Sequence, residues 1–178
     1  MFKKILGIAP NQAEDGAFSP SRLSLKLATS TKTNYDGGVY VNPYTGGKAH
    51  ILVVLTEERN MMMANGKKFS TGNHPVEMAL PMLHFINAGF ELDLVTPTGA
   101  PAIIEEWAMP NNDISVATLF AKYDDALAKP KSLIDFANNS LIDESPYVGG
   151  GAAPDEANAR GRVRLRRRRR PRVRARAG

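Results

Sequence analysis

Ile51-Leu52-Val53-Val54-Leu55 is the stretch that decides the fold. Its residues are all aliphatic, which is typical of a strand buried on both faces in a parallel sheet. The chain has 178 residues, of which 43% are hydrophobic and 23% are charged, a composition that suits one globular domain with a sizeable core. The sequence therefore predicts an α/β domain built around a parallel sheet.

A helix is expected downstream of this strand. A long loop containing Met61–Met63 comes first, and it should either bury two of its methionines or present them as an adaptable surface for client proteins. The helix should begin near His74, with Pro75 at its first position. Pro81 predicts a kink, and Gly89 stands where a C-terminal cap belongs.

Further segments continue the alternation of strand and helix. Phe90–Val95 alternates apolar and acidic residues and predicts a half-buried strand. Helical patterns follow over Asp113–Ala128 and over Pro130–Asn138. Strands and helices in this order, with short connections, predict a βαβ-type layered sheet.

The two ends of the chain differ from its middle. Residues 1–49 are rich in Pro and Gly and are expected to form an irregular arm, with one helical turn near Ser21–Leu27. Residues 50–148 should form the α/β domain. Residues 149–178 should be a disordered tail, because 24 of these 30 residues are Gly, Ala, Arg or Pro.

Charge is also unevenly distributed. The formal net charge is +5, but eleven arginines lie within residues 160–178. Without them, 12 basic residues face 18 acidic ones, so the body is mildly acidic. A G/C-rich gene read in a shifted frame would encode such a tail, and the alternative is a genuine basic extension that binds nucleic acid.

The sequence contains no cysteine, which excludes disulfides, thiolate metal sites and a cysteine nucleophile within it. No run approaches the roughly 18 apolar residues of a membrane helix. The N-terminus lacks the pattern of a signal peptide, so a cytoplasmic location without a membrane partner is expected.

Titratable candidates are few. His50, His74 and His84 do not have the spacing of a metal site and are expected to be capping or surface residues. Glu77 has two interpretations. It can stabilise the helix start, with His74 as N-cap, or it can act as a general acid/base at the mouth of a cleft.

Residues 69–77, Phe-Ser-Thr-Gly-Asn-His-Pro-Val-Glu, closely resemble a signature of the HchA-type family, a branch of the PfpI-like superfamily. These proteins are heat-inducible chaperones that are also known as glyoxalase III and protein deglycases. Other stretches agree in order and spacing from about Ala13 to Tyr147: residues 13–18, 20–21, 57–59, 65–67, 88–90 and 107–110.

The resemblance implies an α/β sandwich with a central, mostly parallel sheet, of the flavodoxin-like, class I glutamine-amidotransferase-like type. It implies a cysteine nucleophile, a histidine and an acid, and it matches Glu77 to the family's glutamate. That carboxyl group would share a proton with the thiolate during conversion of methylglyoxal to lactate without glutathione. Glycated proteins, unfolded clients and a homodimer are the other implied partners.

Two departures limit what the resemblance implies. The family's His, Glu, His metal positions correspond here to Ile86, Glu91 and Tyr123, and Glu91 alone does not hold zinc, so no metal or other cofactor is expected. After Tyr147 the family's next strand and its Gly-Gly-His-Gly turn are replaced by the tail, so the C-terminal half of the fold and its nucleophile are expected to be missing.

Three functions follow as alternatives. The chain is a truncated or frameshifted family member with Glu77 and no nucleophile, or a non-catalytic holding chaperone, or a nonspecific nucleic-acid binder through its arginines. In each case the body is expected to be poorly stable and prone to association, because the strand at Ile51–Leu55 would lose its cover.

Overall fold

The computed structural model describes residues 3, 6–47 and 49–135, and their fold is α/β. A three-stranded parallel sheet has the order β3-β6-β7, with β3 at His50–Val54, β6 at Glu91–Thr96 and β7 at Lys131–Ser132. Helix α3 (Pro75–Asn87) connects β3 to β6, and α4 (Ile114–Ala128) connects β6 to β7. The predicted α/β fold with a parallel sheet is thus confirmed.

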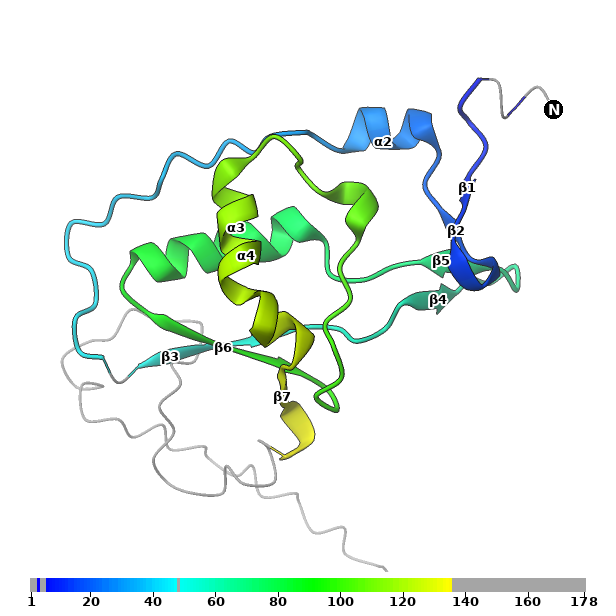
Figure 1. Ribbon diagram of the computed structural model, residues 1–178. Coiled ribbons are helices and arrows are strands. Elements are labelled where there is room, and N and C mark those ends of the chain that lie inside the picture. Colours follow the sequence, from blue (N-terminus) through cyan, green and yellow to red (C-terminus); the bar gives the residue numbers. More distant parts are fainter. Residues whose placement is uncertain (1–2, 4–5, 48, 136–178) are drawn as a thin grey trace, which may run out of the picture.

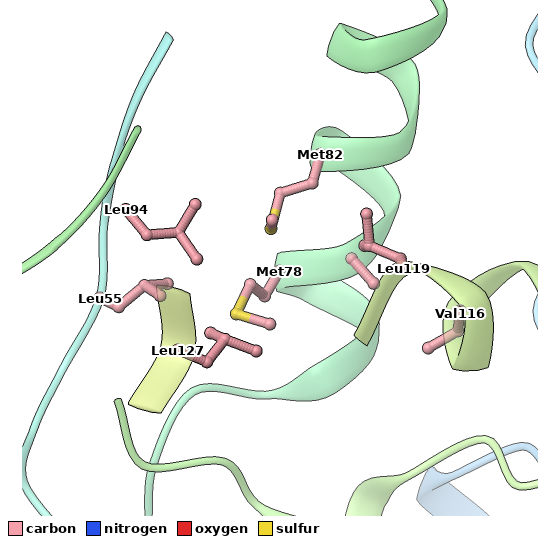
Figure 2. Close-up of a cluster of buried hydrophobic side chains, with 8 residues drawn as sticks. Leu55, Met78, Met82, Leu94, Val116, Leu119 and Leu127 are labelled. Carbon is pink, nitrogen blue, oxygen red and sulfur yellow. The ribbon is translucent and has the colours of Figure 1, made fainter. Parts of the chain in front are cut away.

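Both helices lie on the same side of this sheet (Figure 1), as expected when successive parallel strands share the right-handed crossover. Their apolar sides meet the sheet in one core. Met78 and Met82 of α3 point toward Leu94 of β6 (Figure 2). The other buried members of this core are Leu55, Ala79, Val116, Leu119 and Leu127.

The burial of the strands differs from the prediction. β3 was expected to be buried on both faces, but residues 50–53 are half-buried and Val54 is 57% exposed. The reason is that β3 is an edge strand, and the described helices cover only one face of the sheet. β6 was expected to be half-buried, but residues 94–96 are all buried because β6 is the central strand.

A second, smaller sheet was not predicted. Its order is β1-β2-β5-β4, with β1 at Asn11–Gln12, β2 at Phe18–Ser19, β5 at Lys68–Ser70 and β4 at Asn60–Met62. The predicted long loop is therefore partly a β4–β5 hairpin. Its three methionines, Met61–Met63, are 48%, 64% and 41% exposed, so the expectation that two would be buried is wrong. β4 is an edge strand, which explains their exposure.

The arm over residues 1–49 contributes to that small sheet through β1 and β2, and it includes a 3-10 turn, η1 (Glu14–Gly16). The helical turn expected near Ser21–Leu27 is confirmed as α2 (Arg22–Ala28). Ser21 is its N-cap and accepts a hydrogen bond from the backbone N–H of Ser24. From α2 the chain runs extended around the helices to reach β3 (Figure 1).

The ends of α3 follow the predicted local chemistry. His74 is the N-cap, Pro75 occupies the first turn, and the helix continues through Pro81 to Asn87. Gly89 follows with a φ of 90°, and a Cβ atom there would lie 2.1 Å from the carbonyl oxygen of Tyr44. Only glycine allows this turn and the close approach of the arm.

The third predicted helix, over Pro130–Asn138, is wrong at its start. Lys131–Ser132 form β7 beside β6, because this segment supplies the next parallel strand, and residues 133–135, the last that the structure describes, are helical. Residues 136–178, including the predicted tail, lie outside the described residues. Within the described part of the chain, none of the helices combines the length and the apolar character needed to cross a membrane.

Candidate functional site

A groove of about 450 Å³ lies between β3 and α3. Residues 51–55 form one wall, and residues 72–74 close one end. The opposite wall comes from α3 through Glu77, Pro81 and Phe85, together with Met78 and Met82 beneath them. We call this space the β3–α3 groove.

Helix α3 divides its residues between the groove and the core. Glu77, Pro81 and Phe85 are spaced four residues apart, so they share one face of the helix, and all three are exposed. Met78 and Met82 follow them by one residue and are buried in the core. The groove therefore has a largely apolar wall with a carboxylate at the start of the helix.

Glu77 lies in the first turn of α3 and also lines the groove. Its backbone N–H donates to Nδ1 of His74, at 3.5 Å, so His74 caps the helix as predicted. Its carboxylate lies in the first turn, where the free N–H groups and the helix dipole favour a negative charge. The same carboxylate is exposed on the groove, and it forms no ion pair with another described residue.

The loop that leads into α3 is held by Asn73. Its side-chain N–H groups donate to the carbonyl oxygens of Thr56, at 2.9 Å, and Ile103, at 2.8 Å. Its side-chain oxygen accepts from the backbone N–H of Thr56, at 3.0 Å. One residue thereby joins the end of β3, the start of α3 and the loop before η2 (Glu106–Ala108). These hydrogen bonds fix the start of α3 and so the position of Glu77 in its first turn.

A second carboxylate lies near this end of the groove and was missed by the sequence reasoning. Glu105 accepts a hydrogen bond from Thr71, and burial raises its pKa. The Thr71 hydrogen bond and nearby His74 partly oppose this rise, whereas the charge of Glu77 adds to it. Glu105 sits in a loop without periodic pattern, so no spacing in the sequence could have linked it to Glu77.

Aromatic contacts also hold the start of α3 in place. The ring of His74 packs edge-on against Trp107, with ring centroids 6.4 Å apart, and the ring of Phe69 of β5 also packs edge-on against Trp107, with ring centroids 6.3 Å apart. The indole N–H of Trp107 is buried and has no hydrogen-bond partner among the described residues. The small sheet is thus packed against the loop that carries the helix cap.

The three positions of the family's metal site do not fit a metal ion. Ile86 offers no ligand atom, and the pKa of Tyr123 is raised, mainly by burial and further by Glu91 and Asp93, so its phenol stays protonated. Glu91 instead lies 3.6 Å from a ring nitrogen of His50. Among residues 3, 6–47 and 49–135, no three His, Cys, Asp or Glu side chains gather as a metal site would require.

The three histidines occupy separate places; the capping role predicted for His74 is confirmed, and His50 and His84 are half-buried. His74 caps α3, His84 shares a 2.9 Å hydrogen bond with the hydroxyl of Tyr40, and His50 contacts Asp93 at 3.0 Å. The site that emerges consists of the groove, with Glu77 at its mouth and Glu105 behind it.

The chain is similar in sequence to known proteins. The chain is 49% identical over 139 residues to the protein/nucleic acid deglycase HchA of Pseudomonas aeruginosa (strain UCBPP-PA14). It is 46% and 45% identical to proteins of the same name from Staphylococcus aureus (strains bovine RF122 / ET3-1 and MRSA252). No model of a protein family matches the chain.

These matches cover 78% of this chain but only 47–48% of each relative, so the chain spans about half the length of the curated relatives it matches. Identity of 45–49% over 139 residues is far beyond a chance likeness, and the parallel α/β fold is the one that the resemblance implied. Over this segment the chain is homologous to the HchA-type deglycases, of which it matches about half the length.

Proposed function

We propose that this chain supplies the acid/base part of an HchA-type deglycase, with Glu77 as general acid/base and with a thiol nucleophile that this sequence does not contain. The supporting observation is the exposed carboxylate of Glu77 in the β3–α3 groove, beyond the carboxyl end of β3. Sites in α/β proteins of this type form outside the carboxyl ends of parallel strands.

The proposed chemistry needs a carboxyl group in this place. A thiolate attacks the aldehyde carbon of methylglyoxal to form a hemithioacetal, and a neighbouring carboxyl group moves a proton from that carbon to the adjacent one, which gives a lactoyl thioester. Water then cleaves the carbon–sulfur bond of the thioester, which releases lactate and returns the thiol. The relatives are named protein/nucleic acid deglycases, so glycated protein and glycated nucleic acid are the proposed macromolecular substrates of the complete enzyme. No metal or other cofactor takes part in the proposal.

The test is a chimera in which this chain's matched segment replaces the corresponding segment of the Pseudomonas aeruginosa relative. We expect the chimera to convert methylglyoxal to lactate, and Glu77→Gln to lower kcat/KM by about 10²–10⁴-fold, as removal of a general acid/base does. Glu58→Gln, an exposed carboxylate outside the groove lining, is the matched control. An active chimera that is indifferent to Glu77→Gln would refute the role of Glu77.

A second candidate function is that of a holding chaperone without chemistry. It is supported by apolar side chains that remain exposed in the described part: Val54 and Phe85 on the groove, and Met61–Met63 on and after β4. The measurement is suppression of the aggregation of a heat-denatured client by the purified chain. Suppression that grows with chain concentration, without turnover of methylglyoxal, would support this candidate.

Location and assembly complete the proposal. We propose a cytoplasmic protein whose complete enzyme forms a homodimer. Nonspecific, salt-sensitive binding of nucleic acid through residues 149–178 stays a prediction from their eleven arginines, because those residues lie outside the described part of the chain.

A further inference from the structure

The free edge of β3 faces the β3–α3 groove. The backbone N–H of Leu55 donates to the carbonyl oxygen of Val95 of β6, at 2.8 Å. In a parallel strand, the N–H and C=O of one residue point to the same side, and successive residues alternate. Ile51, Val53 and Leu55 therefore bond toward β6, and Leu52 and Val54 direct their N–H and C=O groups away from it.

This edge is closed at one end and open along the rest. Thr56 directs its backbone groups to the same side as Leu52 and Val54. Its N–H donates to the side-chain oxygen of Asn73, and its carbonyl oxygen accepts from the side-chain N–H of Asn73. Leu52 and Val54 have no strand beside them in the described part of the chain, where β3 ends the sheet. Natural edge strands usually carry Lys, Pro or a bulge that prevents pairing, and β3 has none of these.

The groove has the shape and the charge that an added strand requires. Its length along residues 51–55 is about 16 Å at the rise of a strand, which suits five or six extended residues. Alternate side chains of such a segment would pack on Pro81 and on Phe85, which is 38% exposed. Glu77, at the closed end, offers a carboxylate that has no ion-pair partner among the described residues.

We propose that the β3–α3 groove binds an extended peptide segment, added as a strand to β3, with apolar side chains at alternate positions and a lysine or arginine beside Glu77. Main-chain hydrogen bonds to Leu52 and Val54 supply affinity without regard to sequence, and the wall of α3 and Glu77 select the side chains. The inference rests on the proposed holding function, for which it names the kind of client and the way it binds.

The experiment measures fluorescence anisotropy of labelled hexapeptides with the full chain at about 0.15 M salt, where exposed charges are screened beyond roughly 8 Å. The probe alternates Val and Thr and has a lysine at each end, so that one lysine meets Glu77 in either orientation. Two matched peptides serve as controls. One is N-methylated at alternate residues, and the other has glutamate at each end.

We expect binding of the first peptide to weaken at least tenfold on N-methylation and at least tenfold with glutamate ends. In the chain, Val54→Lys should weaken it at least tenfold and Glu77→Gln about threefold to tenfold. Leu27→Lys, at an apolar residue of α2 that is 78% exposed and is not part of the groove lining, should change it less than twofold. Equal binding of the N-methylated peptide, or indifference to Val54→Lys, overturns the proposal.

The same measurements distinguish a failure of strand addition from a failure of the proposed holding function. If the chain suppresses client aggregation but binds the probe and its N-methylated form equally, the holding function stands and strand addition is wrong. Light scattering gives the other decisive outcome. Self-association that Val54→Lys abolishes, in a chain that binds no peptide, would assign the edge to a second copy and overturn the peptide assignment.

Discussion

The carboxylate of Asp113 joins two segments that are 80 residues apart in the sequence. One oxygen accepts from the backbone N–H of Val116 and caps α4, and the other accepts from the backbone N–H and the hydroxyl of Thr33, at 2.8 Å and 2.5 Å. The side chain is almost fully buried, and these hydrogen bonds, led by the Thr33 hydroxyl, lower its pKa against the opposing effect of burial.

Asp113→Ala should therefore destabilise the protein. We expect a loss of about 1–2 kcal/mol of unfolding free energy, the usual effect of removing an N-cap that is also buried. Urea denaturation measures it, and Asp124→Ala, at an exposed residue of the same helix, is the control. Equal midpoints for the two variants would show that the contact with Thr33 contributes nothing.

The stabilisation by Asp113 should also depend on pH. Its folded pKa is lower than the unfolded value of about 3.9, so its contribution is complete above the unfolded pKa and is lost as pH falls through the folded pKa. The difference between wild type and Asp113→Ala should then be full at pH 6 and shrink below about pH 4. A difference that is constant from pH 6 to pH 3 would contradict the lowered pKa.

Glu105 should show the opposite dependence. Its folded pKa is raised, so the wild type loses stability as pH rises from the unfolded pKa through the folded one. Glu105→Gln removes that loss and keeps an acceptor for Thr71. The variant should be more stable than wild type at pH 7 and equal to it at pH 4, and exposed Glu106→Gln should show no such trend.

At the scale of elements, the site depends on how the start of α3 is tied to its neighbours. Asn73→Ala removes hydrogen bonds to Thr56 and Ile103 and leaves their backbone groups without these partners. We expect a loss of about 1–3 kcal/mol, the cost of unsatisfied polar groups that are removed from water. Asn112→Ala, at an exposed asparagine, is the control in thermal unfolding. Similar melting temperatures for Asn73→Ala and Asn112→Ala would refute the role of Asn73 in holding these segments together.

Elements that depend on local sequence were predictable. The periodic apolar residues of α3 and α4 and the caps at His74 and Gly89 all lie within a few residues of the feature they specify. The β4–β5 hairpin and β7 were not predicted, because short strands are specified by partners distant in sequence, as Phe18 pairs with Phe69. For the same reason, Glu77 was found from its helix, whereas Glu105 required the fold.

At the scale of the whole molecule, the cysteine count decides activity. The sequence contains no cysteine, so the chain alone should not convert methylglyoxal to lactate, because no thiolate attacks the carbonyl. Lactate formation by the purified chain, measured with the full-length Pseudomonas aeruginosa relative as positive control, checks this. Turnover that Glu77→Gln abolishes would show that another nucleophile acts with Glu77.

The exposed edge and apolar surface also predict low stability and association. A chain shortened to residues 1–148 should associate in light scattering, since β3 is open to other strands. It should also unfold at a low temperature for a mesophilic domain, where melting points cluster around 45–65 °C. A monomer that melts cooperatively above about 60 °C would contradict the expectation.

The holding function and the strand-addition proposal both depend on β3 being an open edge beside Glu77, and hydrogen exchange of individual β3 amides tests this directly. Amides bonded to β6, those of Val53 and Leu55, should exchange slowly, and those of Leu52 and Val54 should exchange at least tenfold faster. The lysine-ended peptide should slow the second pair. Equally slow exchange at all four amides in the free, monomeric chain would show that the edge is already covered and that the groove is not available as a site.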